Sequence, residues 1–194
     1  MKLKLNRKFL IVSLGAALLA GGLIMLLILY RSQANSIIAN PNVLANAAPV
    51  KHSPAAISGD PVSIQIPSLG TDLKVTPGVY DAQTQQWTLT LDKVQYATMT
   101  PKPNNESGNT FMYGHYRRNV FANLHTIKMG AQAVVKTSNG HTFYYHLTGA
   151  KVVNPQDSAE VFNYRGKPML TVQTCTGLFF QNRQLFFFQF DKVV

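Results

Sequence analysis

Cys175 is the residue with the clearest chemical potential, because it is the only cysteine in the 194-residue sequence. It ends the alternating, β-branched run 170–175, which predicts a strand, and Gly177 then begins a loop. Arg183 follows eight residues later, at the start of a second apolar strand over 185–190. A guanidinium near a thiol favours the thiolate, which is the nucleophilic form. This arrangement fits a catalytic cysteine.

Alternation divides the strand before Cys175 into two faces. A single cysteine is also often a small, buried apolar residue, so the chemical role of the thiol depends on its position and neighbours. The face expected to point into the core carries Leu170, Val172 and Thr174. The opposite face carries Thr171, Gln173 and Cys175.

His115 is the favoured histidine partner for the thiol. It follows the strand-like run 109–113 and Gly114, and it precedes a polar loop. That position is typical of the mouth of a barrel. The other four histidines have other expected places: His52 solvated in a linker, His125 on the surface or rim, His141 exposed at a turn and His146 structural within a strand.

Arg183 has two interpretations from the sequence alone. An arginine that enters a strand is ordinarily a solvated charge at the rim of a sheet. Near a reactive thiol it would instead bind substrate or stabilise negative charge. Position alone leaves both interpretations open.

The segment from residue 61 onward predicts a mostly β domain. Its strand-like runs are short and separated by frequent turn signals, including Ser138-Asn139-Gly140, which favours an antiparallel sandwich or barrel with little helix. Short helices are expected over 119–127 and 157–162. The expected strands are 62–66, 72–75 (closed by Pro77-Gly78), 87–91, 109–113, 131–136, 141–147, 150–153, 170–175 and 185–190.

The amino-terminal part predicts a membrane anchor. A basic tail over 1–8 precedes 22 uncharged residues over 9–30, which is enough to span a bilayer, and the cations keep the amino terminus in the cytoplasm. A cleaved signal peptide is the alternative, but the apolar run is longer than a typical signal core. Residues 31–60, with three prolines and many Ala, Asn and Ser, predict a flexible linker to an extracellular domain over 61–194.

The charge of the chain does not indicate nucleic-acid binding. The formal charge is +10, but residues 61–194 hold 12 Lys and Arg against 7 Asp and Glu, and Arg117-Arg118 is the only basic pair after residue 8. A nucleic-acid interface would need a basic cluster on one face. One cysteine also excludes an intrachain disulfide and a CxxC zinc site.

The motifs around these residues resemble the sortase family of cysteine transpeptidases. Thr171-Val172-Gln173-Thr174-Cys175 is similar to the T-L-x-T-C signature, with valine in place of leucine, and the run 109–115 resembles the strand that delivers the catalytic histidine. Segments 62–73, 121–124 and 152–157 also resemble family segments, in the family's order. Besides Val172, two features depart from the family: Gly130-Ala131, where many members have Gly-Asp, and the short connection from Cys175 to Arg183.

The resemblance implies a closed β-barrel and an acyl transfer through a thioester. Cys175 would attack a backbone carbonyl in the C-terminal sorting signal of a secreted protein, and His115 would act as general acid and base. Arg183 would bind the substrate backbone or the oxyanion. The accepting amine would belong to a cell-wall precursor or a pilin subunit.

Two other functions remain open from the residues: a membrane-anchored cysteine peptidase, which hydrolyses, and an inactive peptide-binding module. No acid lies between Glu106 and Asp157, so a carboxylate that orients His115 is not evident nearby. No cofactor is expected. Some family members bind calcium, but here only Asp157 and Glu160 lie in the relevant loops, which is too few for a calcium site, and none is expected.

Overall fold

The computed structural model describes residues 56–84, 86–157 and 159–194. The expected basic tail over 1–8, the membrane anchor over 9–30 and the linker up to residue 55 lie outside this part of the chain. Among the described residues, no helix is both long and apolar enough to cross a bilayer.

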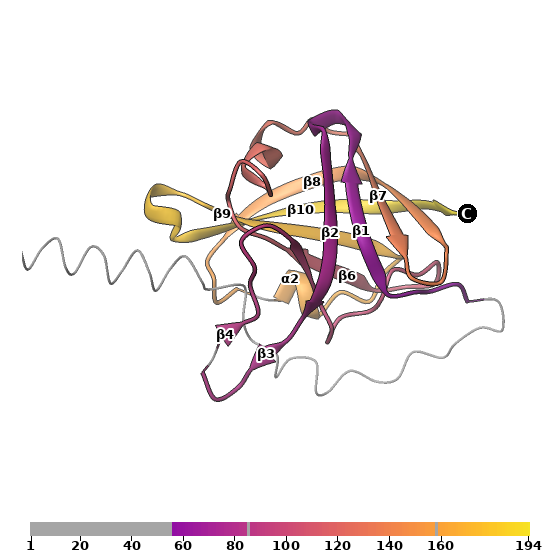
Figure 1. Cartoon of the computed structure of the whole chain (residues 1–194), viewed down its shortest axis with the longest axis horizontal. Helices are drawn as coiled ribbons and strands as arrows, with labels where there is room; N and C mark the ends of the chain where they lie inside the picture. Colours follow the sequence, from indigo (N-terminus) through magenta and orange to yellow (C-terminus); the bar gives the residue numbers. More distant parts are fainter. Residues whose placement is uncertain (1–55, 85, 158) are drawn as a thin grey trace, which may run out of the picture.

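Eight strands close into a barrel in the order β1-β2-β5-β6-β9-β10-β8-β7 (Figure 1). The expected mostly β fold with a closed barrel is therefore confirmed, and the alternative of a sandwich is wrong. The barrel strands are β1 (Pro61–Ile66), β2 (Thr71–Gly78), β5 (Val94–Ala97), β6 (Asn109–Tyr113), β7 (Gln132–Thr137), β8 (Thr142–Val153), β9 (Met169–Thr176) and β10 (Asn182–Val193).

Two of the pairs formed by neighbouring strands in the barrel are parallel, so the expected antiparallel arrangement is wrong in part. The pairs β2·β5 and β6·β9 are parallel, whereas the remaining pairs are antiparallel. A parallel pair needs a long crossover connection, and the β7–β8 hairpin and its flanking loops supply one between β6 and β9. This crossover places β6 beside the strand that carries Cys175.

Strand β2 does not end before Pro77-Gly78 as expected. Its first half pairs with β1, whereas residues from Val75 to Gly78 pair with β5. Pro77 has no N–H for a ladder, and it lies beyond the part of β2 that pairs with β1. The proline is therefore accommodated in the strand.

The core of the domain has two parts on opposite faces of the central strands. The barrel interior contains Met112 of β6, Val172 of β9 and Phe186 of β10. The outer face of the same region packs Phe111 and Leu185 in a second cluster, together with residues of other elements. Both faces of these strands are therefore buried.

Small elements cover this outer face. Trp87 stacks on Phe162 with ring centroids 6.3 Å apart and contacts Tyr113 at 5.5 Å. The covering elements are a hairpin of β3 (Tyr80–Asp81) and β4 (Gln86–Trp87), and α2 (Ala159–Phe162), which Figure 1 shows beside β6. The strand expected over 87–91 is thus reduced to its first residue.

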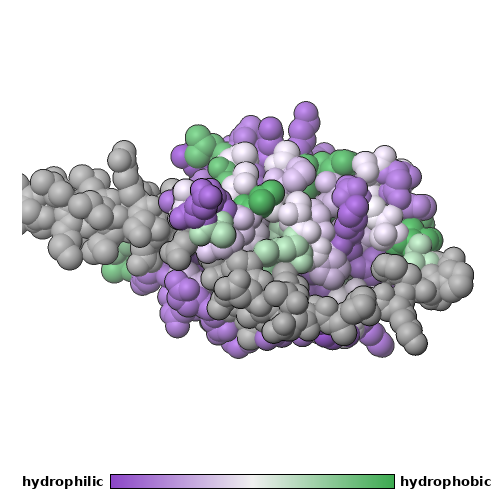
Figure 2. All heavy atoms as spheres, turned by 90° about the horizontal axis from the view of Figure 1, so that it is seen from below, coloured by the Kyte–Doolittle hydropathy of each residue, from purple (hydrophilic) through white to green (hydrophobic). Residues whose placement is uncertain are grey.

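Three 3₁₀ helices complete the described part, and helix is scarce as expected. The helices expected over 119–127 and 157–162 are present but shorter, as a 3₁₀ helix and α2. The 3₁₀ helices are η2 (Pro67–Leu69), η3 (Ala122–Thr126) and η4 (Leu178–Phe180). Figure 2 shows that the uncovered part of the face seen from below is mainly hydrophilic or neutral, with apolar residues in small separate spots.

Candidate active site

The adjacent strands β6, β9 and β10 bring the segments that carry His115, Cys175 and Arg183 to the same end of the barrel. Cys175 lies directly opposite Arg183 in the antiparallel pair β9·β10. In the parallel pair β6·β9, Tyr113 lies opposite Gln173, and the N–H of Gly114 donates to the carbonyl of Gln173 at 3.1 Å. Continuing that register by two residues places His115 level with Cys175.

Cys175 and Arg183 leave their strands on the same face. Side chains alternate along a strand, so Arg183 shares a face with Leu185, which belongs to the outer cluster. His115 lies two residues beyond Tyr113, which is the last residue of β6 and a member of the same cluster. Cys175, which lies opposite Arg183 in the ladder, projects on this outer face as well.

The turn that carries His115 needs a glycine. A Cβ on Gly114 would come within 2.9 Å of the side chains of Phe121 and Val120. The hydroxyl of Thr174 donates to the Gly114 carbonyl at 3.2 Å, which ties β9 to this turn. Thr174, expected only as a core residue, is indeed buried and also helps to fix the place of His115.

Arg183 is fully buried, with 0% of its surface exposed. The interpretation as a solvated rim charge is therefore wrong. One Nη of its guanidinium donates to the carbonyls of Phe180 at 2.9 Å and Asn182 at 2.8 Å. These bonds hold the charge beside Cys175.

Burial dominates the protonation of the thiol. Burial raises the pKa of Cys175, and the nearby charge of Arg183 opposes that change without cancelling it. Burial likewise lowers the pKa of Arg183, and the Cys175 thiolate opposes the change. The sequence-based expectation that Arg183 favours the thiolate gives the right direction for that one contribution, but the net shift of the Cys175 pKa is upward.

The imidazole of His115 is shifted in the opposite direction. Burial, and then the positive charge of Arg117, lower the pKa of His115. At neutral pH the resting site therefore holds a neutral imidazole and a neutral thiol. Transfer of the thiol proton to the imidazole would create the nucleophile.

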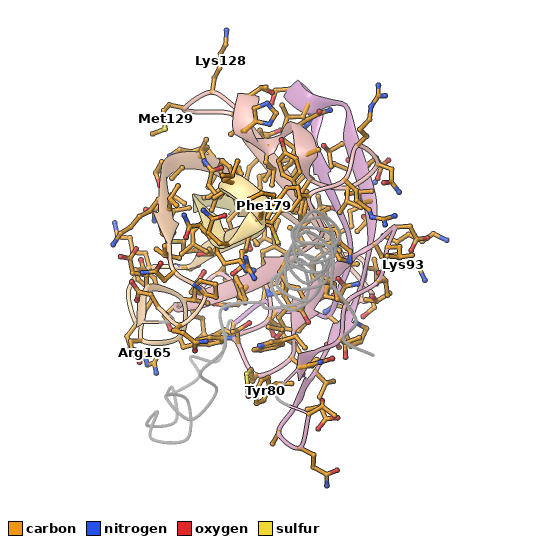
Figure 3. All side chains as sticks on the ribbon, turned by 90° about the vertical axis from the view of Figure 1, so that its left-hand side faces the viewer. Tyr80, Lys93, Lys128, Met129, Arg165 and Phe179 are labelled. Carbon is orange, nitrogen blue, oxygen red and sulfur yellow. The ribbon has the colours of Figure 1, made fainter. Side chains whose placement is uncertain are left out.

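A short loop between β9 and β10 stands beside these residues. Leu178 and Phe179 are 74% and 53% exposed, whereas Phe180 is half-buried. Figure 1 shows this loop extending beyond the left end of the barrel, and in Figure 3 Phe179 lies near the middle of that end. The apolar loop therefore lies at the same end of the barrel as Cys175 and Arg183.

The other described histidines lie in different surroundings. His125 is exposed in η3, where its Nδ1 contacts the Ala122 carbonyl. His146 pairs with Asp191 at 2.5 Å across β8 and β10. His141 is half-buried at the β7–β8 turn rather than exposed as expected, and His52 lies outside the described residues.

No cluster of three potential metal ligands is present among the residues that the structure describes. Glu160, one of the two acids considered for calcium, forms an ion pair with Lys151.

Sequence reasoning did not identify Tyr116 and Phe180, which contact each other beside the site with ring centroids 5.4 Å apart. The available signal was the run Leu178-Phe179-Phe180, since three large apolar residues in a loop are unusual.

Comparisons with known proteins converge on one family. A family model described as "Sortase domain" matches residues 64–187. Comparison with curated proteins gives no match.

Solved structures of several sortases share the fold. Sortase C-1 from Actinomyces oris is 25% identical, with a TM-score of 0.55 over 69% of this chain and 76% of that one. Sortase E1 from Streptomyces coelicolor, solved with a tripeptide in its active site, is 20% identical, with a TM-score of 0.58 over 70% and 90%. Sortase A from Corynebacterium diphtheriae is 20% identical, with a TM-score of 0.59 over 88% and 82%.

Proposed function

The chain belongs to the sortase family, and we propose on that premise that it is a membrane-anchored cysteine transpeptidase with its catalytic domain outside the cell. Its substrates are secreted proteins with a C-terminal sorting signal. The acceptor is an amine of a cell-wall precursor or of a pilin subunit. The observation that supports the proposal is the strand pairing that sets Cys175 directly opposite Arg183 and brings β6, which leads into His115, alongside β9.

The first half of the reaction forms a thioester. His115 takes the proton of the Cys175 thiol, and the thiolate attacks the scissile carbonyl, so that a C–S bond forms and the carbonyl electrons move to oxygen. The buried guanidinium of Arg183 stabilises this oxyanion or holds the substrate backbone. The C–N bond then breaks, and the leaving amine takes the proton from the His115 imidazolium.

The second half reverses these roles. The acceptor amine attacks the thioester and gives its proton to His115. A new C–N bond forms as the C–S bond breaks, and Cys175 leaves as the thiolate, which recovers its proton from the imidazolium. The two shifted pKa values keep the resting thiol and imidazole neutral, and both make the transfer of the thiol proton to His115 an uphill step before substrate binds.

The test is mass spectrometry of the full chain in nanodiscs, incubated with a library of sorting-signal peptides. We expect a mass adduct on Cys175 that small glycine-type amines convert to a ligated peptide. The Cys175→Ala variant should lose the adduct while its circular dichroism spectrum is unchanged.

The same experiment separates the alternatives. A cysteine peptidase would release hydrolysed peptide only, even at high amine concentration. An inactive binding module would give neither adduct nor product. An adduct that survived Cys175→Ala would rule out the proposed nucleophile.

A further inference from the structure

Two loops flank Cys175, and an aromatic pair joins them. One loop follows β6 and carries His115 and Tyr116, and the other connects β9 to β10 and carries Phe180. The rings of Tyr116 and Phe180 are 5.4 Å apart at an angle of 42°. We refer to this pair, Tyr116 and Phe180, as the aromatic bridge. On its other side, the ring of Tyr116 lies 6.2 Å from that of His125.

The backbone of Phe180 adopts a conformation that an aromatic residue rarely takes. Phe179 and Phe180 are consecutive left-handed residues with φ of 58° and 59°. Without glycine's freedom, such residues persist only where surrounding contacts hold them. The N–H of Phe180 donates to the carbonyl of Gly177 at 3.0 Å, and its ring forms the bridge.

The same conformation aims the Phe180 carbonyl at the guanidinium of Arg183, which donates to it at 2.9 Å. Phe180 therefore makes two connections at once. Its carbonyl accepts a hydrogen bond from Arg183, on the β10 side of Cys175. Its ring contacts Tyr116, which follows His115 on the β6 side. Arg183 is also held by the Asn182 carbonyl at 2.8 Å, so Phe180 supplies one of two carbonyl contacts to this Nη.

We propose that Phe180 is a positioning residue that couples the two partners of Cys175, fixing Arg183 through its carbonyl and the His115 loop through the aromatic bridge. The inference rests on the proposed function for its meaning in the reaction. The coupling itself is a property of the loops and is measurable on the thiol alone. Loss of the ring frees the loop, and Arg183 and His115 then shift independently of each other.

The chain offers a matched control one residue away. Phe179 has the same side chain and the same left-handed backbone, but it is 53% exposed, and no ring contact of Phe179 is present among the described residues. Phe179→Ala and Phe180→Ala are therefore the same chemical change in the same backbone conformation. Only the second removes the aromatic bridge.

The experiment measures alkylation of Cys175 by iodoacetamide against pH, on the full chain in nanodiscs. We expect Phe180→Ala to lower the rate at pH 8 by roughly 2- to 12-fold, the range that corresponds to an aromatic pair. The pH midpoint should also rise, because Arg183 then stabilises the thiolate less. Phe179→Ala should leave both unchanged.

A double-mutant cycle tests the bridge itself. Tyr116→Ala removes the same ring contact from the other loop and serves equally if Phe180→Ala does not fold. Tyr116→Phe keeps the ring and should behave as the unmodified protein. If the bridge exists, Tyr116→Ala in the Phe180→Ala background adds little further loss.

Three results would overturn the proposal: equal effects of Phe179→Ala and Phe180→Ala, multiplicative losses in the double variant, or a loss with Tyr116→Phe as large as with Tyr116→Ala. Transfer assays with a peptide and an amine then separate the two proposals. An altered alkylation profile without any thioester would contradict the proposed function alone. Normal alkylation in Phe180→Ala, with a thioester still formed, would contradict the coupling alone.

Discussion

Between Thr174 and Arg183 the chain leaves the interior of the protein and returns to it. Thr174 and Arg183 are 1% and 0% exposed, whereas Leu178 and Phe179 between them are 74% and 53% exposed. The strand ends around Thr174 and Arg183, which we call the floor, are held by ladder hydrogen bonds, whereas Leu178 and Phe179 form an exposed tip of the loop. We expect changes in the floor to affect the chemistry strongly and changes in the loop to adjust its rate.

The largest effect should come from His115→Asn, which removes the imidazole proposed to accept and donate protons in the reaction. General acid–base catalysis typically contributes about 10²- to 10⁴-fold, so kcat/KM for peptide transfer should fall by that order. His125→Asn is the control, since His125 also lies near Tyr116 but in η3. Equal losses in both variants would contradict the special place of His115.

Arg183→Lys should lower kcat by about 10²- to 10³-fold, the usual loss for a group that stabilises an oxyanion. Lysine keeps the charge but not the planar guanidinium that bonds to two carbonyls. Arg165→Lys is a close control, because one Nη of Arg165 also donates to two carbonyls, those of Phe162 and Tyr164. A transfer rate unaffected by Arg183→Lys would limit the role of Arg183 to its charge.

Gly114→Ala tests the close packing between the end of β6 and the turn that carries His115. The added methyl group would lie 2.9 Å from Phe121 and Val120, so the free energy of unfolding should fall by about 1–3 kcal/mol. Urea titration measures it. In Gly149→Ala the new Cβ meets Phe187 at 3.9 Å, an ordinary contact, and stability should change much less.

The pH dependence of thiol alkylation should show the upward shift of the Cys175 pKa. The rate follows the thiolate fraction, so its midpoint should lie above the value of about 8.5 for a free thiol. Replacing Arg183 by Gln should raise the midpoint further, because the charge of Arg183 lowers the pKa. A midpoint well below 8.5 in the unmodified protein would mean that Arg183 outweighs burial.

The smallest expected effect is that of a chelator. Transfer activity should be unchanged in EDTA, since the sequence offers too few acids near the site for calcium. Activity that is lost in EDTA and restored by calcium would contradict this prediction.

The barrel was accessible from the sequence because turns and alternation mark its strands, and family motifs mark the three candidate residues, whose joint role stays a prediction. Strand β5 was not predicted, because it is only four residues long and its polar residue, Gln95, is buried together with Val94, Tyr96 and Ala97. The side-chain Nε2 of the buried Gln95 donates a hydrogen bond to the Thr90 hydroxyl at 2.6 Å.

The other differences between the predicted and the observed structure have their cause in tertiary packing. The sequence predicts two strands over 141–147 and 150–153, but the structure has one continuous strand, β8. Its pairing with β10 shifts register near Thr148, so the strand continues through the residues that separate the two predicted runs. The sequence leaves the environment of Arg183 open, because burial of a lone charge depends on carbonyl contacts from a loop whose conformation the sequence does not specify.

The parallel pair β6·β9 joins Tyr113 to Gln173, sixty residues apart along the chain. Such non-local pairings form slowly during folding, because the intervening segment must be ordered first. The segments that carry His115 and Cys175 therefore come together only when this crossover is complete. During refolding from denaturant, enzymatic competence should emerge with the final cooperative phase, after the local β7–β8 hairpin has formed.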